Sequence, residues 1–168
     1  YNSMAAAISA RVFEISDSLI RKSLQDFQNV EHRLESVLKV NNIEFINDSK
    51  ATNVHATWYA LESMTRNIVW IAGGVDKGNN YDQLNNLVKD KVHTIVVMGR
   101  SSKKIINHFK EIVPNIIKVD DMQSAVSKAY RLGKNGDSIL LSPACSSFDQ
   151  FQNYEERGRV FKECVFSL

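Results

Sequence analysis

The feature that most constrains the fold of this chain is the alternation of short apolar runs with stretches of helical spacing. The runs expected to form strands span 34–40, 43–46, 68–72, 94–98, 116–119 and 138–141. The expected helices cover 52–63, 81–88, 102–109, 122–132 with Gly133 as C-cap, and the tail from about 154. Because continuous apolar strands that alternate with helices are covered on both faces, this pattern predicts an α/β fold: a Rossmann-like, mostly parallel sheet with helices on both faces.

Two parts of the chain depart from the alternation. Asn41-Asn42 separates the first two strands, and since Asn tolerates positive φ, we expect an antiparallel hairpin at one edge of the sheet. Before residue 31, helices are favoured from Asn2 to about Ala10 and again after Ser16, which can cap the second one. These two helices have little to bury alone. We therefore expect two units, 1–30 and 31–168, the first of which packs on a segment upstream.

Composition and charge exclude several classes of protein. The net charge is only +2, with acidic and basic residues interleaved, so we expect no nucleic-acid partner. No apolar run approaches the roughly 18 residues of a membrane helix, so we expect no membrane partner. Cys145 and Cys164 are too few for a disulfide scaffold, which favours a reduced, cytoplasmic protein. The four histidines lack metal-ligand spacing, so we expect no protein-built metal site.

Three polar segments follow directly after expected strands. They span 48–53, 73–78 and 142–149. In a parallel sheet, ligands bind at the carboxyl ends of the strands, and loops held by a rigid sheet commonly carry binding groups. These segments are therefore the candidate site.

Each segment also has a simpler structural interpretation. In 48–53, Lys50 beside a helix N-terminus suits phosphate, but Thr52 or Asn53 could equally cap the helix after a turn. In 73–78, glycines let the backbone approach a ligand beside Lys77, yet the segment is neither a P-loop nor a dinucleotide fingerprint, and such turns are common.

The third segment contains Cys145, which no spacing pairs with a histidine. We expect a small buried hydrophobe there rather than a nucleophile. We interpret the charged residues that follow as helix-surface pairs (Asp149, Glu155, Glu156, Arg157, Arg159). Four aromatic residues are expected to pack in the core or between helix and sheet (Trp58, Tyr59, Trp70, Phe151).

Taken together, these motifs resemble the C-terminal motifs of the D-glutamate-adding Mur ligases in order and spacing. The motifs are EHR at 31–33, DSKATN at 48–53, GGVDKG at 73–78, SPACSSFD at 142–149, FQNY at 151–154 and RG at 157–158. Residues 1–6 resemble the last helix of the central ATPase domain of that family. The resemblance covers nearly the whole chain, and the DSKATN and SPAC segments together are specific to this member among the Mur ligases.

The resemblance implies an ATP-dependent, Mg²⁺-assisted ligase. In that family ATP phosphorylates the carboxylate of UDP-N-acetylmuramoyl-L-alanine, and the amine of D-glutamate attacks the acyl phosphate to form an amide in peptidoglycan precursor synthesis. It further implies that residues 1–30 are the end of the central ATPase domain, that residues 31–168 form the glutamate-binding domain, and that the protein is a monomer.

The resemblance also implies roles for individual residues. For D-glutamate, it assigns the side-chain carboxylate to Thr52 and Lys77, and the α-carboxylate to Ser147 with Phe148 and Tyr154. For ATP, it places Asn2 near the base, Asp48 at the ribose and Arg33 at the phosphates. It puts Lys50 near the γ-phosphate and the charge that develops during the reaction, as the catalytic residue.

The sequence departs from the family in what it lacks. It contains no Gly-rich Lys-Ser/Thr phosphate loop, no central-domain lysine for carbamate formation and no UDP-binding domain. We therefore expect this chain alone to be inactive, with Mg²⁺ bound mainly by the central domain and a hinge near 29–31 for domain closure. Two alternatives stay open: another Mur-type ligase, such as a relative of folylpolyglutamate synthetase, or a stand-alone module that binds a nucleotide or an amino acid.

Overall fold

The computed structural model describes residues 2–26 and 30–168, and the chain divides into two compact units, 1–30 and 31–168. The assignment of the first unit to a central ATPase domain stays a prediction. Residue 29 of the expected hinge lies outside the described residues, and so does the side chain of Asn2.

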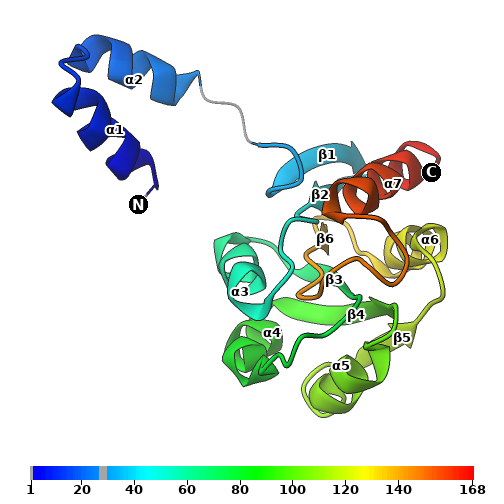
Figure 1. The fold of residues 1–168 in the computed structure, drawn as a ribbon. Coiled ribbons are helices and arrows are strands. Elements are labelled where there is room, and N and C mark those ends of the chain that lie inside the picture. The colour runs from blue at the N-terminus through cyan, green and yellow to red at the C-terminus, as the bar shows by residue number, and fades with distance from the viewer. Residues whose placement is uncertain (1, 27–29) are drawn as a thin grey trace. The chain divides into compact units, whose positions relative to one another are not determined.

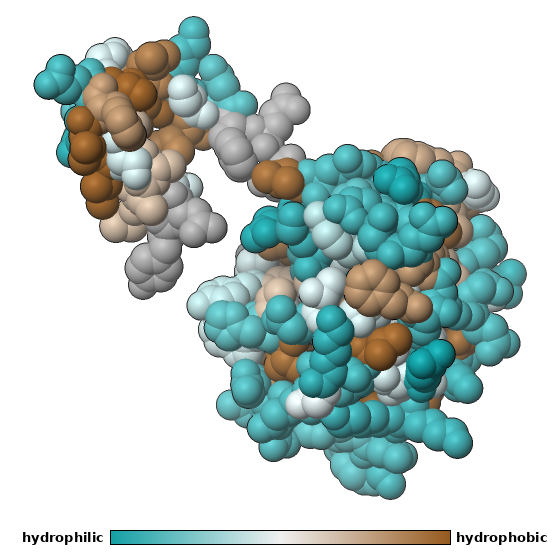
Figure 2. All heavy atoms as spheres, viewed as in Figure 1, coloured by the Kyte–Doolittle hydropathy of each residue, from teal (hydrophilic) through white to brown (hydrophobic). Residues whose placement is uncertain are grey.

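The first unit consists of two helices, α1 (Asn2–Val12) and α2 (Asp17–Gln25), as expected. Ser16 is the N-cap of α2, but its side chain makes no capping hydrogen bond. The side chain of Arg11 donates to the carboxylate of Asp17, the first residue of α2, at 3.0 Å. No residue of α2 is buried. Large apolar side chains are exposed along this unit and colour much of it brown in Figure 2 (Met4, Ile8, Val12, Phe13, Leu19).

The second unit is built on a six-stranded sheet with the order β1-β2-β6-β3-β4-β5. Its strands are β1 (Glu35–Val40), β2 (Ile43–Asn47), β3 (Ile68–Gly73), β4 (Val92–Met98), β5 (Asn115–Lys118) and β6 (Ser138–Leu141). All pairings are parallel except β1 with β2, which confirms the predicted mostly parallel sheet with an antiparallel edge. Asn41 and Asn42 in the turn between β1 and β2 have φ of 47° and 64°, as the hairpin prediction requires.

Helices cover both faces of the sheet (Figure 1). They are α3 (Val54–Ser63), the 3₁₀ turn η1 (Tyr81–Leu84), α4 (Asn85–Lys91), α5 (Ser102–Phe109), α6 (Met122–Leu132) and α7 (Tyr154–Phe166). One apolar core lies between the sheet and α3, α4 and α5, and contains Trp70 and Leu61. A second core lies between the sheet and α6 and α7, and contains Phe45 and Phe161. This arrangement confirms the predicted fold class.

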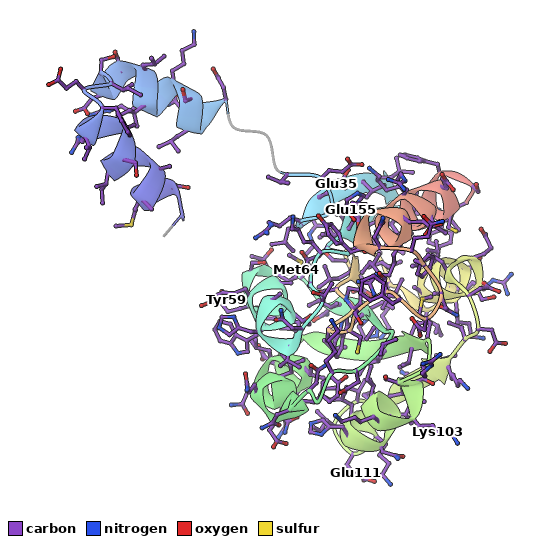
Figure 3. The ribbon with its side chains drawn as sticks, viewed as in Figure 1. Glu35, Tyr59, Met64, Lys103, Glu111 and Glu155 are labelled. Carbon is purple, nitrogen blue, oxygen red and sulfur yellow. The ribbon has the colours of Figure 1, made fainter. Side chains whose placement is uncertain are left out.

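Gly133 is the C-cap of α6, as expected, and its backbone is extended, with φ of −67°. One detail differs from expectation. Tyr59 does not pack in the core: its side chain projects from α3 into solvent and is 54% exposed (Figure 3). No helix in the described residues is long and apolar enough to cross a membrane.

Candidate functional site

The three polar loops follow the carboxyl ends of three adjacent parallel strands, β2, β6 and β3. Asn47 of β2 pairs with Leu141 of β6, and Leu141 pairs in turn with Ile71 of β3. The chain leaves β3 towards α4 on one face and leaves β6 towards α7 on the other. Open α/β sheets bind ligands at the carboxyl ends of their strands, beside such a divergence.

The loops after β3 and β6 are bonded directly to each other. The amide of Val75 donates to the carbonyl of Ser146 at 2.9 Å, and the amide of Ser146 donates back at 3.1 Å. Gly74 makes this approach possible because its φ is +133° and a Cβ there would lie 2.2 Å from the Ser146 carbonyl oxygen. The two loops therefore form one surface.

The loop after β2 is held from inside the protein. Asp48 is 5% exposed, and its two oxygens accept hydrogen bonds from the amide of Leu34 at 3.3 Å and the hydroxyl of Ser142 at 2.8 Å. Burial raises the pKa of Asp48 to about 6, although these hydrogen bonds and the charge of Arg33 oppose the rise. Arg33 itself is exposed.

The same loop begins α3. The amide of Ala51 donates to the carbonyl of Asp48 at 2.9 Å, which closes a turn, and the side chain of Asn53 caps the helix by accepting from Ala56 at 2.9 Å. The expected turn and cap are thus both present. Lys50 lies within the turn and remains half-buried, not fully covered. The turn and the helix cap are therefore compatible with phosphate binding by Lys50.

Lys50 and Tyr154 are in direct contact. The ammonium of Lys50 donates to the phenol oxygen of Tyr154 at 3.0 Å and lies 5.0 Å from the centre of its ring. The hydroxyl of Ser49 donates to the backbone carbonyl of Tyr154 at 2.8 Å. A residue assigned to the γ-phosphate by resemblance and one assigned to D-glutamate therefore touch.

Lys77 is exposed, and its ammonium lies 5.8 Å from the centre of the Phe148 ring, which is 68% exposed. The preceding Asp76 holds the base of the loop, because it accepts from the amides of Gly78 at 2.6 Å and Asn79 at 2.9 Å. Asp76 also binds Lys104 and Tyr81, at 3.0 and 2.9 Å.

The remaining assigned residues lie in the same loops. Ser147 is buried and its carbonyl accepts from the amides of Gln150 and Phe151. Thr52 is half-buried after Lys50, to whose carbonyl its amide donates at 2.9 Å. Across the described ranges, no hydrogen bond joins the side chain of Thr52 to Lys77 or Ser147. These three residues lie at the same end of the sheet because their loops follow adjacent strands, and not because their side chains bond to one another.

Arg157 contradicts the expectation of a helix-surface pair. Its side chain lies in the first turns of α7, is only 2% exposed, and donates to the hydroxyl and carbonyl of Ser49 and to the carbonyl of Cys145. The expectation failed because residue type alone does not tell which face of a helix meets the loops. The adjacent Gly158 was an available signal, since a glycine inside a helix costs about 1 kcal/mol and often marks a close approach.

Cys145 is buried as expected, and burial raises the pKa of its thiol to about 11, which disfavours the nucleophilic thiolate. One group of possible metal ligands, Glu31, His32 and Glu35, lies near the start of the second unit. The ammonium of Lys162 forms ion pairs with both Glu31 and Glu35, so the two carboxylates already have a cationic partner.

The chain is similar in sequence to known proteins. Residues 32–145 match the family described as Mur ligase, glutamate ligase domain. A UDP-N-acetylmuramoylalanine--D-glutamate ligase of Christiangramia forsetii is 55% identical over 99% of this chain. One of Salinibacter ruber is 51% identical over 100% of this chain. The chain spans 38% and 36% of the lengths of these two relatives.

Solved structures share the fold at low sequence identity. The UDP-N-acetylmuramate-alanine ligase MurC of Thermotoga maritima has a TM-score of 0.69 at 15% identity, over 99% of this chain and 37% of that one. The E. coli FolC in complex with ADP has a TM-score of 0.66 at 18% identity, over 97% of this chain and 38% of that one. At these identities the likeness concerns the fold alone.

Proposed function

The chain belongs to the Mur ligase family, whose glutamate ligase domain it matches, and from this premise we propose that it is the amino-acid-binding part of a UDP-N-acetylmuramoylalanine–D-glutamate ligase. The observation that carries the proposal is the meeting of three loops from adjacent parallel strands, two of them joined by the Val75–Ser146 bridge. Their lysines, hydroxyls and backbone amides suit a small dicarboxylate amino acid beside a nucleotide. The proposed enzyme works in the cytoplasm as a monomer.

We assign D-glutamate to the surface that the loops after β3 and β6 form together. Lys77 and Thr52 bind the side-chain carboxylate. Ser147 binds the α-carboxylate, together with Tyr154 and the backbone near Phe148. Two separate carboxylate sites fix the direction of the amine, which is how the site distinguishes the D from the L enantiomer. Good alignment of the amine with the acyl phosphate contributes about 7–11 kcal/mol to catalysis in well-oriented systems.

ATP is assigned to the loop after β2. Arg33 and Lys50 supply positive charge for the phosphates, and Asn2 is placed near the base. Asp48 accepts a ribose hydroxyl, because each carboxylate oxygen has two lone pairs and only one hydrogen bond on each is used in the structure. Lys50 lies near the transferred phosphoryl group and stabilises the negative charge that develops there during the reaction.

The proposed reaction has two steps. The carboxylate of UDP-N-acetylmuramoyl-L-alanine attacks the γ-phosphorus of ATP, which gives an acyl phosphate and ADP. The amine of D-glutamate then attacks the acyl carbon, loses a proton and expels inorganic phosphate, which leaves the amide. Mg²⁺, when bound with ATP, neutralises phosphate charge. We assign no Mg²⁺ ligand to this chain and place the ion mainly in the central domain of the complete enzyme.

The test uses the protein encoded by the complete reading frame. It is incubated with ATP, Mg²⁺, UDP-N-acetylmuramoyl-L-alanine and D-glutamate, L-glutamate or diaminopimelate, and product mass and phosphate release are measured. We expect the complete protein to form an amide with D-glutamate and not with L-glutamate or diaminopimelate. We expect the 168-residue chain to form no amide. Preference for L-glutamate or diaminopimelate would indicate a different Mur-type ligase, and binding without turnover in the complete protein would indicate a binding module.

A further inference from the structure

Arg157 is a buried cation that spans two of the three loops. Its Nε and Nη2 atoms donate to the hydroxyl and the carbonyl of Ser49, at 3.0 and 2.8 Å. Its Nη1 atom donates to the carbonyl of Cys145 at 3.0 Å. One planar group thus fastens the loop after β2 to the loop after β6.

The position of this guanidinium is energetically demanding. Burial lowers the pKa of Arg157 to about 10, and within residues 2–26 and 30–168 no carboxylate forms a salt bridge with it. A buried charge is tolerated only when hydrogen bonds replace its hydration. Here those bonds come from loop carbonyls and a hydroxyl, so the loops and the arginine stabilise one another.

The chemistry of the bonds requires an arginine. The rigid fork of a guanidinium presents donors in two directions, so it can bind both polar groups of Ser49 on one side and Cys145 on the other. The ammonium of a lysine is a single point charge and cannot hold both loops at a fixed spacing. Helix α7 is itself fixed, because Asn153 caps it and the ring of His32 packs against Gly158.

Each loop that Arg157 binds carries assigned residues next to the contact. Ser49 lies between Asp48 and Lys50, on the nucleotide side. Cys145 is followed by Ser146, which bridges to Val75, and by Ser147 on the amino-acid side. A change in the spacing of these loops therefore alters both sites at once.

We propose that Arg157 is a positioning residue that couples the nucleotide site to the amino-acid site. It holds the Ser49 and Cys145 loops at one spacing, so that ligand binding on one loop favours binding on the other. The inference rests on the proposed function. Misplacement of reacting groups by about 1 Å can cost on the order of 100-fold in rate, so a modest loosening of this spacing has a measurable effect.

The experiment compares Arg157→Lys with Arg159→Lys in the complete enzyme. Arg159 is exposed two residues further along the same helix, so its variant controls for an arginine-to-lysine change on α7 at a position outside the buried contact. The affinity for D-glutamate is measured with and without a non-hydrolysable ATP analogue, at saturating UDP-N-acetylmuramoyl-L-alanine. The KM values for ATP and D-glutamate and the thermal unfolding temperature are measured alongside.

In the wild type and in Arg159→Lys, we expect the analogue to raise the affinity for D-glutamate at least about fivefold, within the usual range of coupling between sites. In Arg157→Lys, this ratio should fall towards one and both KM values should rise about tenfold or more. A lower kcat or unfolding temperature with unchanged KM values and an unchanged ratio would overturn the proposal, as would a rise in only one KM.

Should Arg157→Lys fail to fold, Ser49→Ala provides the second test. It removes the hydroxyl that accepts from Nε and donates to the carbonyl of Tyr154, and it leaves the carbonyl bond to Nη2 in place. We expect a smaller loss of the same coupling ratio, and an unchanged ratio in this variant would overturn the proposal. If the wild type uses another amino acid, the assignment to D-glutamate fails, but the coupling can be measured with that amino acid.

Discussion

The loops after β2 and β3 contribute to one edge of the sheet, yet they are held in opposite ways. In the loop after β2, Asp48 and Ser49 are buried and Lys50 is hydrogen-bonded through its ammonium to Tyr154. In the loop after β3, Lys77 is exposed, and in the described part of the chain its ammonium forms no hydrogen bond or ion pair. This ammonium lies 5.8 Å from the centre of the Phe148 ring.

The difference concerns when each loop loses its conformational freedom. A side chain that is already bonded gives up little freedom when a ligand binds, whereas immobilising a long free side chain costs about 0.5–1.5 kcal/mol. We infer that the nucleotide side of the proposed site is formed before its ligand arrives. We infer that the proposed amino-acid side is completed when D-glutamate binds, and that the hydrogen bonds of Asp76 to the loop limit how far Lys77 can move.

Asp48→Asn should have the largest effect, and it tests the buried loop. Because burial raises the pKa of Asp48 from 3.8 to about 6, its ionisation opposes folding, and stability is lost as pH rises from about 4 to 6. This difference corresponds to about 3 kcal/mol. The variant should lack that loss in urea unfolding of the 168-residue chain between pH 4 and 7. The exposed Asp120→Asn is the control, and identical pH profiles for wild type and Asp48→Asn would refute the burial.

Lys77→Ala tests the exposed loop. It removes one charge-assisted hydrogen bond to the bound carboxylate, which is worth about 1.5–3 kcal/mol, so the KM for D-glutamate in the complete enzyme should rise about 10- to 150-fold. The KM for ATP, measured at saturating D-glutamate, should hardly change, since Lys77 is not assigned to the nucleotide side. Lys103→Ala, on the surface of α5 (Figure 3), is the control. An unchanged KM for D-glutamate would count against the role of Lys77.

Gly158→Ala should have the smallest effect, and it loosens the support behind the buried loop. A Cβ at Gly158 would lie 2.2 Å from Nδ1 of His32, whose carbonyl accepts from the amide of Lys50. Overpacking of this kind costs about 1–3 kcal/mol, partly offset by the better helix propensity of alanine. Urea unfolding should show a net loss of about 1–2 kcal/mol, against little change in Arg159→Ala. A stabilised Gly158→Ala would show that the His32 ring does not occupy this position.

The fold was largely predictable from the sequence because its signals are local. Apolar runs and helical spacing located each strand and helix to within a few residues, and Asn41-Asn42 identified the hairpin through the conformational tolerance of asparagine. Tyr59 was misassigned because an aromatic residue on a helix with apolar neighbours can face either way. Only the packing of α3 on the sheet decides its direction.

The site was less predictable because its polar residues are organised by contacts across the chain. The sequence placed three loops after strands, but it could not order those strands, which is what brings β2, β6 and β3 together. It also grouped Arg157 with Arg159, although one is buried between loops and the other is exposed. A contact between residues about 100 positions apart, such as that of Arg157 with Ser49, leaves no local pattern.

Backbone amide hydrogen exchange of the complete enzyme, with and without D-glutamate, shows whether the nucleotide side is formed before D-glutamate binds and the amino-acid side only afterwards. With the ATP analogue and UDP-N-acetylmuramoyl-L-alanine present throughout, we predict that D-glutamate slows exchange at residues 76–78 and 146–148. Residues 49–51 should exchange slowly in both states. The account would be contradicted if D-glutamate protected neither segment, or if residues 49–51 exchanged as fast as 76–78 before D-glutamate was added.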